Sequence, residues 1–128
     1  MQTLLEAPAK NESIVHEARG FHLLLTLKGC DAEILNDQTK LEELTRAAAS
    51  ATGATVLEIC AHKFKPQGVT ALAVLAESHA SLHSYPESNV VFWDCFTCGT
   101  ECMPELSISV LVTALKPQSY TKEIIYRH

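Results

Sequence analysis

The chain has 128 residues, with 47% hydrophobic and 20% charged side chains and a formal net charge of -5. This composition is typical of one globular domain and excludes disordered, collagen-like and coiled-coil chains. Lys and Arg form no cluster that would attract nucleic acid or an anionic membrane, and no apolar run approaches the roughly 20 residues that cross a bilayer, so we expect neither partner. Residues 1–19 show no sustained hydrophobic period, and we interpret them as an extension before a domain of residues 20–128.

The first half of the domain alternates strands with one helix. Apolar residues recur at every second position in residues 21–27, which predicts a strand. A helix is predicted between an N-cap at Asn36 or Asp37 and a stop at Gly53, because leucines and alanines keep helical spacing in between. Residues 54–64 then have the character of a second strand.

Turn residues divide the next part of the chain. Pro and Gly in residues 65–68 predict a tight turn, from which residues 69–77 return as an antiparallel strand. The turn-like residues 85–89 precede an apolar run over residues 90–96, which predicts another buried strand.

The chain ends with a helix and a strand. The helix is predicted to start at Pro104 and to stop before Pro117, and a strand follows over residues 120–125. Together these elements predict an α/β two-layer sandwich, in which two helices cover one face of a mostly antiparallel sheet. Because several strands are apolar on both faces, we expect a second subunit to pack against the other face and form a homodimer.

The five cysteines are an odd number in a chain whose first residues lack the apolar core of an export signal, which favours free thiols in the cytoplasm. Cys95, Cys98 and Cys102 also permit a zinc or redox site of the CxxC type. This alternative is weaker because no fourth ligand follows at the usual spacing, and we expect no metal. Cys30 and Cys60 are expected to pack as small apolar residues in or near the core.

Reactive side chains are densest in residues 77–87 and 95–99. A serine with a histidine five residues later is compatible with a nucleophile and its base, although such pairs also occur by chance. His22 and His62 lie on predicted strands and are expected to be structural. The role of His79 stays open, because along a strand its side chain would point away from that of the preceding serine.

A family resemblance rests on three segments, Ala76-Glu77-Ser78-His79 through His83, Pro86-Glu87, and Phe96-Thr97-Cys98-Gly99. With these motifs the chain resembles the bacterial and archaeal S-adenosylmethionine decarboxylase proenzymes. The resemblance extends over about residues 20–116.

This resemblance implies that the chain cuts itself between Glu77 and Ser78 into parts of 77 and 51 residues. Ser78 would become an N-terminal pyruvoyl group, which is the covalent cofactor of the family. By the same resemblance His83 acts as acid and base in this processing, and Thr70 supplies a hydroxyl. Thr70 and Ser78 are eight residues apart, so their side chains share a face if one strand runs through both.

The resemblance further implies that the processed protein decarboxylates S-adenosylmethionine, a small molecule whose product donates aminopropyl groups in spermidine synthesis. Cys98 would return a proton to the carbon that loses carbon dioxide. Phe64 and Tyr85 would face the sulfonium or the adenine, and Glu87 would bind the ribose hydroxyls. Core packing is an almost equally good interpretation of Phe64.

Departures from the family pattern bear on the substrate. Tyr85 stands where the family commonly has Trp, which weakens a cation-π contact, and Phe92 and Trp93 are bulkier than the residues usual there. A narrower pocket favours the alternative of a pyruvoyl-dependent arginine or ornithine decarboxylase. A third hypothesis is a non-catalytic regulatory homologue, against which the retained serine, histidine and cysteine argue.

Overall fold

The computed structural model describes residues 17–99 and 101–128, so most of the extension predicted over residues 1–19 lies outside the described residues. Within them the chain forms six strands, two α-helices and two short 3-10 helices. In chain order the elements are β1 (Gly20–Lys28), α1 (Gln38–Ala51), β2 (Val56–Lys63), β3 (Val69–Leu75), β4 (Ser78–Tyr85), η1 (Pro86–Ser88), β5 (Val90–Cys98), η2 (Pro104–Leu106), α2 (Ser107–Leu115) and β6 (Ser119–Arg127).

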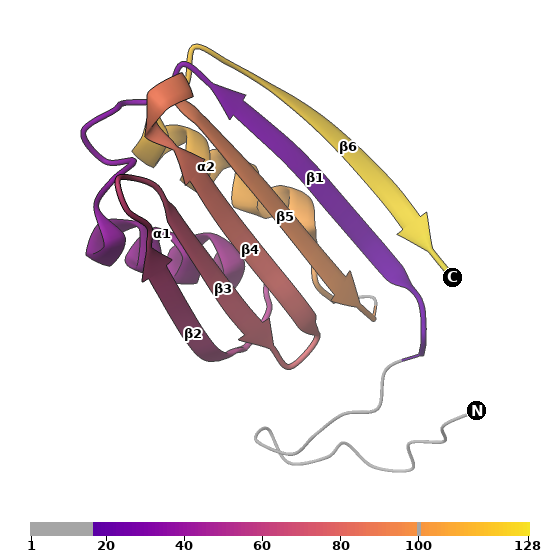
Figure 1. The fold of residues 1–128 in the computed structure, drawn as a ribbon. Coiled ribbons are helices and arrows are strands. Elements are labelled where there is room, and N and C mark those ends of the chain that lie inside the picture. Colours follow the sequence, from indigo (N-terminus) through magenta and orange to yellow (C-terminus); the bar gives the residue numbers. More distant parts are fainter. Residues whose placement is uncertain (1–16, 100) are drawn as a thin grey trace.

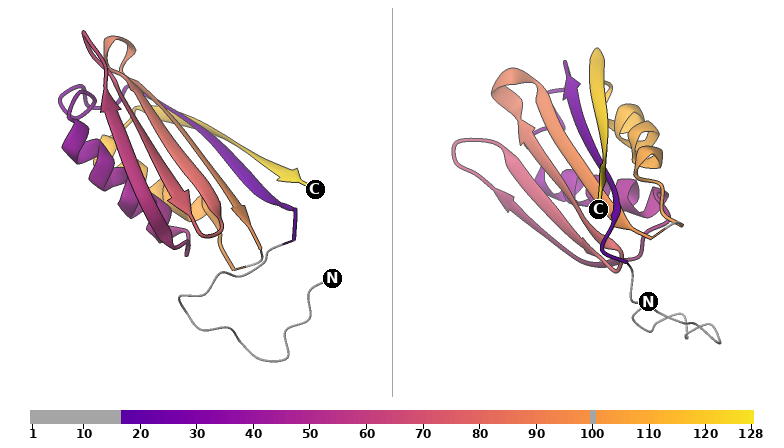
Figure 2. Two further views of the ribbon diagram at one scale, coloured as in Figure 1. Left: turned by 60° about the horizontal axis from the view of Figure 1, so that its bottom comes forward. Right: turned by 90° about the vertical axis from the view of Figure 1, so that its right-hand side faces the viewer.

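The strands form one sheet in the order β2-β3-β4-β5-β1-β6, and neighbouring strands are antiparallel throughout. Helices α1 and α2 both lie on one face of this sheet (Figure 1). The two views in Figure 2 confirm that no helix of the described residues covers the opposite face, which we call the open face. The predicted α/β two-layer sandwich is therefore confirmed.

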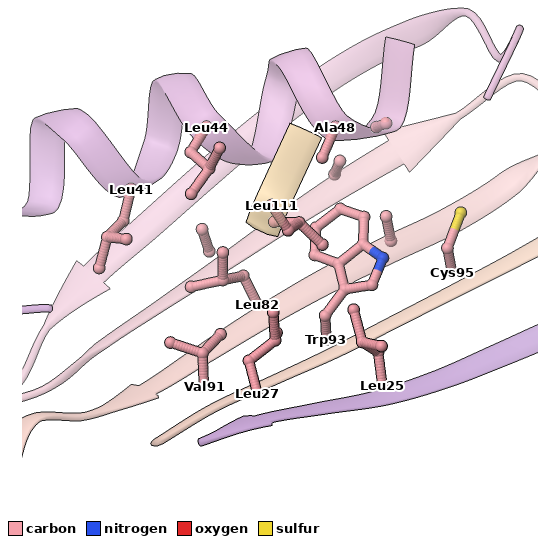
Figure 3. Close-up of a cluster of buried hydrophobic side chains, with 14 of the residues drawn as sticks. Leu25, Leu27, Leu41, Leu44, Ala48, Leu82, Val91, Trp93, Cys95 and Leu111 are labelled. Atoms are coloured by element: carbon pink, nitrogen blue, oxygen red, sulfur yellow. The ribbon is translucent and has the colours of Figure 1, made fainter. Parts of the chain in front are cut away.

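Alternating residues of the strands fill the space between the sheet and the helices. Figure 3 shows Trp93 of β5 in this core, with Leu82 of β4 and Leu111 of α2 beside it. The Trp93 indole N–H donates a hydrogen bond of 3.0 Å to Ser107 Oγ at the start of α2. Because its polar atom has a partner, this large side chain can be buried completely.

The helix boundaries agree with the sequence signals, with one shift. The Asp37 carboxylate accepts the Lys40 N–H over 3.0 Å and caps α1. Gly53 has a φ of 93°, which a residue with a side chain rarely adopts, and it follows the helix end. Pro104 opens η2 and not the α-helix itself, which begins at Ser107.

The strand predicted over residues 69–77 is β3, but the strand that follows it was not predicted. β3 ends at Leu75, a turn follows, and β4 runs back from Ser78. Thr70 therefore does not share a strand with Ser78, and its register partner on β4 is His83. The idea of one strand through Thr70 and Ser78 was wrong, and the turn between them was missed because no Gly or Pro marks it.

The open face mixes hydrogen-bonding groups with exposed apolar side chains. Leu72, Val74, Tyr85 and Phe92 keep between 43% and 48% of their surface exposed there. Apolar exposure on this scale is typical of a surface that binds a partner. Neither α-helix of the described part of the chain is long and apolar enough to cross a bilayer.

Candidate active site

The turn between β3 and β4 is held from both sides. Ala76 N–H donates to the Thr55 carbonyl over 3.0 Å, and a Glu77 carboxylate oxygen accepts the Thr55 N–H over 2.9 Å. On the other side the Cys98 N–H donates to the Glu77 carbonyl oxygen over 2.9 Å. The peptide bond between Glu77 and Ser78 is thus fixed, and its carbonyl is polarised by a backbone donor.

Ser78 has an unusual backbone conformation. Its φ is 147°, in a region that residues with a side chain rarely adopt. A residue held there stores strain on the order of 1–3 kcal/mol, and such strain is concentrated at functional sites. The strain lies directly at the peptide bond for which the sequence predicts cleavage.

A polar cluster surrounds Asp94 on the open face. The Asp94 carboxylate contacts His22 Nε2 at 2.7 Å and His79 Nε2 at 3.3 Å, and it accepts a hydrogen bond from the Ser81 hydroxyl. His79 Nδ1 in turn lies 3.3 Å from Ser78 Oγ. An unbroken series of polar contacts therefore joins Asp94 to the serine of the predicted cleavage site.

Asp94 is charged at neutral pH. Burial alone would raise the pKa of its carboxyl, but the hydrogen bonds from Ser81 and His22 and the charges of His79 and His22 outweigh burial and hold the pKa below its ordinary value. The charge anchors both histidines. Ligand atoms of His22, His79 and Asp94 lie within 4.8 Å of one another, but their mutual hydrogen bonds already account for this arrangement without a metal ion.

His83 lies farther along β4, in a different setting. Its Nδ1 is 3.1 Å from Thr70 Oγ1, and its Nε2 is 3.2 Å from Ser81 Oγ. The structure thus brings together the two residues expected to assist processing. It does not bring them to Ser78, because five residues of an extended strand separate His83 from Ser78 by about 16 Å, at roughly 3.3 Å per residue.

The predicted substrate-binding residues lie at the same end of the sheet as His83. The Phe64 ring, just after β2, is 4.6 Å from the His62 ring, and the Tyr85 ring is 5.4 Å from that of Phe92. Glu87 is exposed on η1, directly after β4. Phe64 is 46% exposed, so the alternative of core packing is wrong.

The predicted site residues accordingly form two groups in the chain. The first, which we call the Ser78 group, consists of Glu77, Ser78 and Cys98. The second, which we call the His83 group, consists of Phe64, Thr70, His83, Tyr85 and Glu87. The two groups occupy opposite ends of the strands.

The cysteines do not form a CxxC site. Cys95 points into the core, as Figure 3 shows, whereas Cys98 is half-buried and pairs with Gly20 on the open face. Residues three apart on a strand point to opposite faces, so this pair cannot chelate zinc or close a disulfide. Cys30 is buried as expected, but Cys60 is exposed on β2, so the prediction that it lies in or near the core was wrong.

Sequence reasoning missed several residues of the polar cluster. Asp94 lies in an apolar run. The available signal was that this acidic residue stands between two buried residues of a strand, so its own side chain must lie on the other face. His22, expected to be a structural histidine, is hydrogen-bonded to Asp94, and its Nδ1 lies 3.4 Å from the Arg127 guanidinium. Arg127 also lies over the Phe96 ring, 4.7 Å from its centre.

Comparisons with known proteins show the family of the chain. The family model described as S-adenosylmethionine decarboxylase matches residues 21–128. The chain belongs to this family. A protein of Methanococcus vannielii named "S-adenosylmethionine decarboxylase proenzyme" is 46% identical over 98 residues, which cover 77% of this chain and 80% of the relative. A protein of the same name from Brevibacillus brevis is 42% identical over 107 residues, covering 83% and 80%.

Solved structures support the fold of the family. The adenosylmethionine decarboxylase of Aquifex aeolicus superimposes with a TM-score of 0.78 at 29% identity and covers 87% of this chain and 92% of that one. A Trypanosoma brucei AdoMetDC monomer superimposes with a TM-score of 0.60 at 13% identity, over 81% of this chain and 45% of that one. The second likeness concerns the fold alone.

Thiol labelling will test the environments of the cysteines. Burial raises the pKa of Cys30 and Cys102 to about 11 and that of Cys95 to about 12, so these thiols carry almost no thiolate at neutral pH. An alkylating reagent should modify Cys60 and Cys98 first and reach the other three only after unfolding. Mass mapping of peptides over time measures this order, and labelling of Cys95 as fast as Cys98 would contradict it.

Proposed function

We propose that this chain is a self-processing, pyruvoyl-dependent decarboxylase of S-adenosylmethionine, whose product donates aminopropyl groups in spermidine synthesis in the cytoplasm. The observation that carries the proposal is the Glu77 carbonyl, which accepts the Cys98 N–H next to a strained Ser78. Family membership and relatives at 42–46% identity that are named as proenzymes of this decarboxylase support it.

Self-cleavage follows from the chemistry of these groups. Ser78 Oγ attacks the Glu77 carbonyl, and the Cys98 N–H stabilises the negative charge that develops on the carbonyl oxygen. The amide becomes an ester as the Ser78 nitrogen leaves. Loss of the Ser78 α-proton then expels the Glu77 carboxylate, and hydrolysis of the remaining dehydroalanine releases ammonia and leaves the pyruvoyl group on residues 78–128.

The surroundings of Ser78 fit such a group. Thr97 is the register partner of Ser78, and within the described residues its hydroxyl is the buried side-chain oxygen without a hydrogen-bond partner. An unpaired buried hydroxyl is costly, so it is available to a new polar neighbour. Once formed, the pyruvoyl group supplies a sink for the electrons released when carbon dioxide leaves. The half-buried Cys98 thiol is the proton donor to that carbon.

A homodimer completes the site in this proposal. The Ser78 group and the His83 group lie at opposite ends of the open face, about 16 Å apart along β4. If two open faces pack together about a two-fold axis that reverses the strand direction, each His83 group meets the Ser78 group of the other protomer. The same packing buries the exposed apolar residues of this face. The partner subunit's His83 then acts as acid and base in the elimination.

The aromatic residues of the His83 group favour a cationic substrate. Phe64 and Tyr85 present exposed rings, which attract a sulfonium, and Glu87 is an exposed acceptor for ribose hydroxyls. Arginine and ornithine also carry a cation, but neither has an adenosyl group to occupy two rings and an acceptor together. These contacts make S-adenosylmethionine the preferred substrate.

Self-cleavage is the first test. Freshly purified protein should contain parts of residues 1–77 and 78–128, and intact mass spectrometry should find the second part lighter by the loss of ammonia from its serine terminus. Ser78→Ala should remain a full-length chain, because no oxygen nucleophile is left. Thr97→Ser, which keeps the hydroxyl, is the matched control and should cleave. A wild-type chain that stays intact after prolonged incubation would refute the proposal.

Mixed dimers test the composite site. Ser78→Ala and His83→Ala should each be inactive alone, but coexpression should restore carbon dioxide release to at most half of the wild-type level, because only one of the two sites in a hybrid dimer combines an intact Ser78 with an intact His83. Two tags and tandem purification isolate the hybrid. Hybrids without activity would mean that both groups act within one protomer.

Substrate preference is measured as kcat/KM on fully processed protein, because this ratio reports differential binding of the transition state. The value for S-adenosylmethionine should exceed those for arginine and ornithine. Tyr85→Phe should retain the preference, whereas Tyr85→Ala should lower the ratio for S-adenosylmethionine by about 2- to 30-fold, as expected for loss of a cation-π contact. A higher kcat/KM for arginine or ornithine would show that one of these amino acids is the preferred substrate. It would not contradict the proposed processing mechanism.

A further inference from the structure

One histidine contacts the predicted nucleophile, and it is not the histidine expected from the family resemblance. His79 Nδ1 lies 3.3 Å from Ser78 Oγ, whereas both ring nitrogens of His83 contact other hydroxyls, those of Thr70 and Ser81. Parity along a strand would separate the side chains of Ser78 and His79. The φ of 147° at Ser78 breaks this alternation and allows the contact.

The neighbours of His79 determine which of its nitrogens carries the proton. Its Nε2 lies 3.3 Å from the Asp94 carboxylate, and an ionised carboxylate can only accept hydrogen bonds. The proton of neutral His79 is therefore on Nε2. Nδ1 is left with a lone pair that faces the Ser78 hydroxyl, which is the arrangement required of a general base.

Asp94 is itself fixed in place. Ser81 donates to its carboxylate from β4, and His22 contacts the same carboxylate at 2.7 Å from β1. Arg127 of β6 contacts His22, whose ring lies edge-on to that of His79 with centroids 5.8 Å apart. The Glu77 carboxylate accepts a hydrogen bond from the Thr55 N–H. A serine, a histidine and an aspartate thus form a relay with the geometry of nucleophile, base and orienting group.

From this geometry we infer that His79 is the general base of self-cleavage and that Asp94 is the residue that positions it. The inference rests on the proposed function and assigns its first step to residues of a single protomer. His79 Nδ1 takes the proton of Ser78 Oγ as the oxygen attacks the Glu77 carbonyl. As the bond from this carbonyl carbon to the Ser78 nitrogen breaks, the imidazolium gives the proton to that nitrogen, so His79 ends neutral.

The inference separates two histidines by the step at which each acts. Without His79 the ester between Glu77 and Ser78 should form slowly. Without His83 the ester should form and then accumulate, because the partner subunit's His83 acts afterwards, on the α-proton. Hydroxylamine distinguishes the two states, since it cleaves an ester rapidly and an amide hardly at all.

The experiment follows newly synthesised full-length chains by denaturing electrophoresis, with and without hydroxylamine. His79→Ala should slow the appearance of both spontaneous and hydroxylamine-released fragments by about 10²-fold or more, which is the usual contribution of a general base. Added imidazole should partly restore the rate. His128→Ala, which removes an exposed histidine at the chain end, is the matched control and should cleave like the wild type.

The positioning role of Asp94 requires a test whose result a merely structural role would not produce. Asp94→Asn should slow ester formation in the wild-type background but add little to the defect of His79→Ala, because a positioning residue acts only through its partner. Additive effects of the two substitutions would refute the role of Asp94. His79→Gln provides a second variant if His79→Ala does not fold, and circular dichroism with thermal melts checks both.

The outcomes keep the two proposals apart. A wild-type chain that forms neither fragments nor a hydroxylamine-sensitive ester refutes the proposed function itself. A wild-type chain that cleaves, together with His79 variants that form the ester at the same rate, refutes the role of His79 and leaves the proposed function standing.

Discussion

The register between β4 and β5 is the constraint on which the site depends. This pairing sets Ser78 opposite Thr97 and Ser81 opposite Asp94, and it brings the Cys98 N–H to the Glu77 carbonyl. A slip by one residue would turn each of these side chains to the other face. The register is fixed from the opposite side of the sheet, where Leu82 and Trp93 are paired and wholly buried. The core therefore sets the geometry of the polar face.

The two faces of the sheet divide the requirements of stability and chemistry. The helix face buries leucines, alanines and Trp93, and its thiols are uncharged because burial raises the pKa of Cys95. The open face keeps its charge and hydroxyl groups in contact with one another around Asp94. Gly20 is needed where β1 pairs with Cys98 of β5. A Cβ at this position would lie 2.1 Å from the Thr97 carbonyl oxygen and push β1 away from Cys98.

The sequence predicted the fold better than the site. The period of the hydrophobic residues, the cap at Asp37 and the positions of Pro and Gly are local signals. They located both helices and most of the strands. The turn before Ser78 was missed because it contains neither Gly nor Pro. That one omission allowed a single strand through Thr70 and Ser78, which lie on β3 and β4.

The contacts of the site depend on partners far apart in the chain. Asp94 contacts His22 across 72 positions, and no spacing rule connects the two. His79 illustrates a second limit, because the parity argument assumes a regular strand and the φ of Ser78 is not regular. Family resemblance pointed to Ser78, His83 and Cys98 as candidate site residues but did not predict the distance that separates His83 from the other two.

The strand order has a further consequence for the two halves of the proposed cleavage. Residues 1–77 supply β1, β2 and β3, and residues 78–128 supply β4, β5 and β6, yet across the sheet the order is β2-β3-β4-β5-β1-β6. β1 is thus enclosed by β5 and β6 from the other half, and each half contributes one helix to the shared core. Neither half contains a complete hydrophobic core. In the proposed cleavage, the halves remain interlocked after the peptide bond is cut. Because the pairing of β4 with β5 sets the contact to the Glu77 carbonyl, the proposed pyruvoyl group forms only in molecules whose sheet is complete.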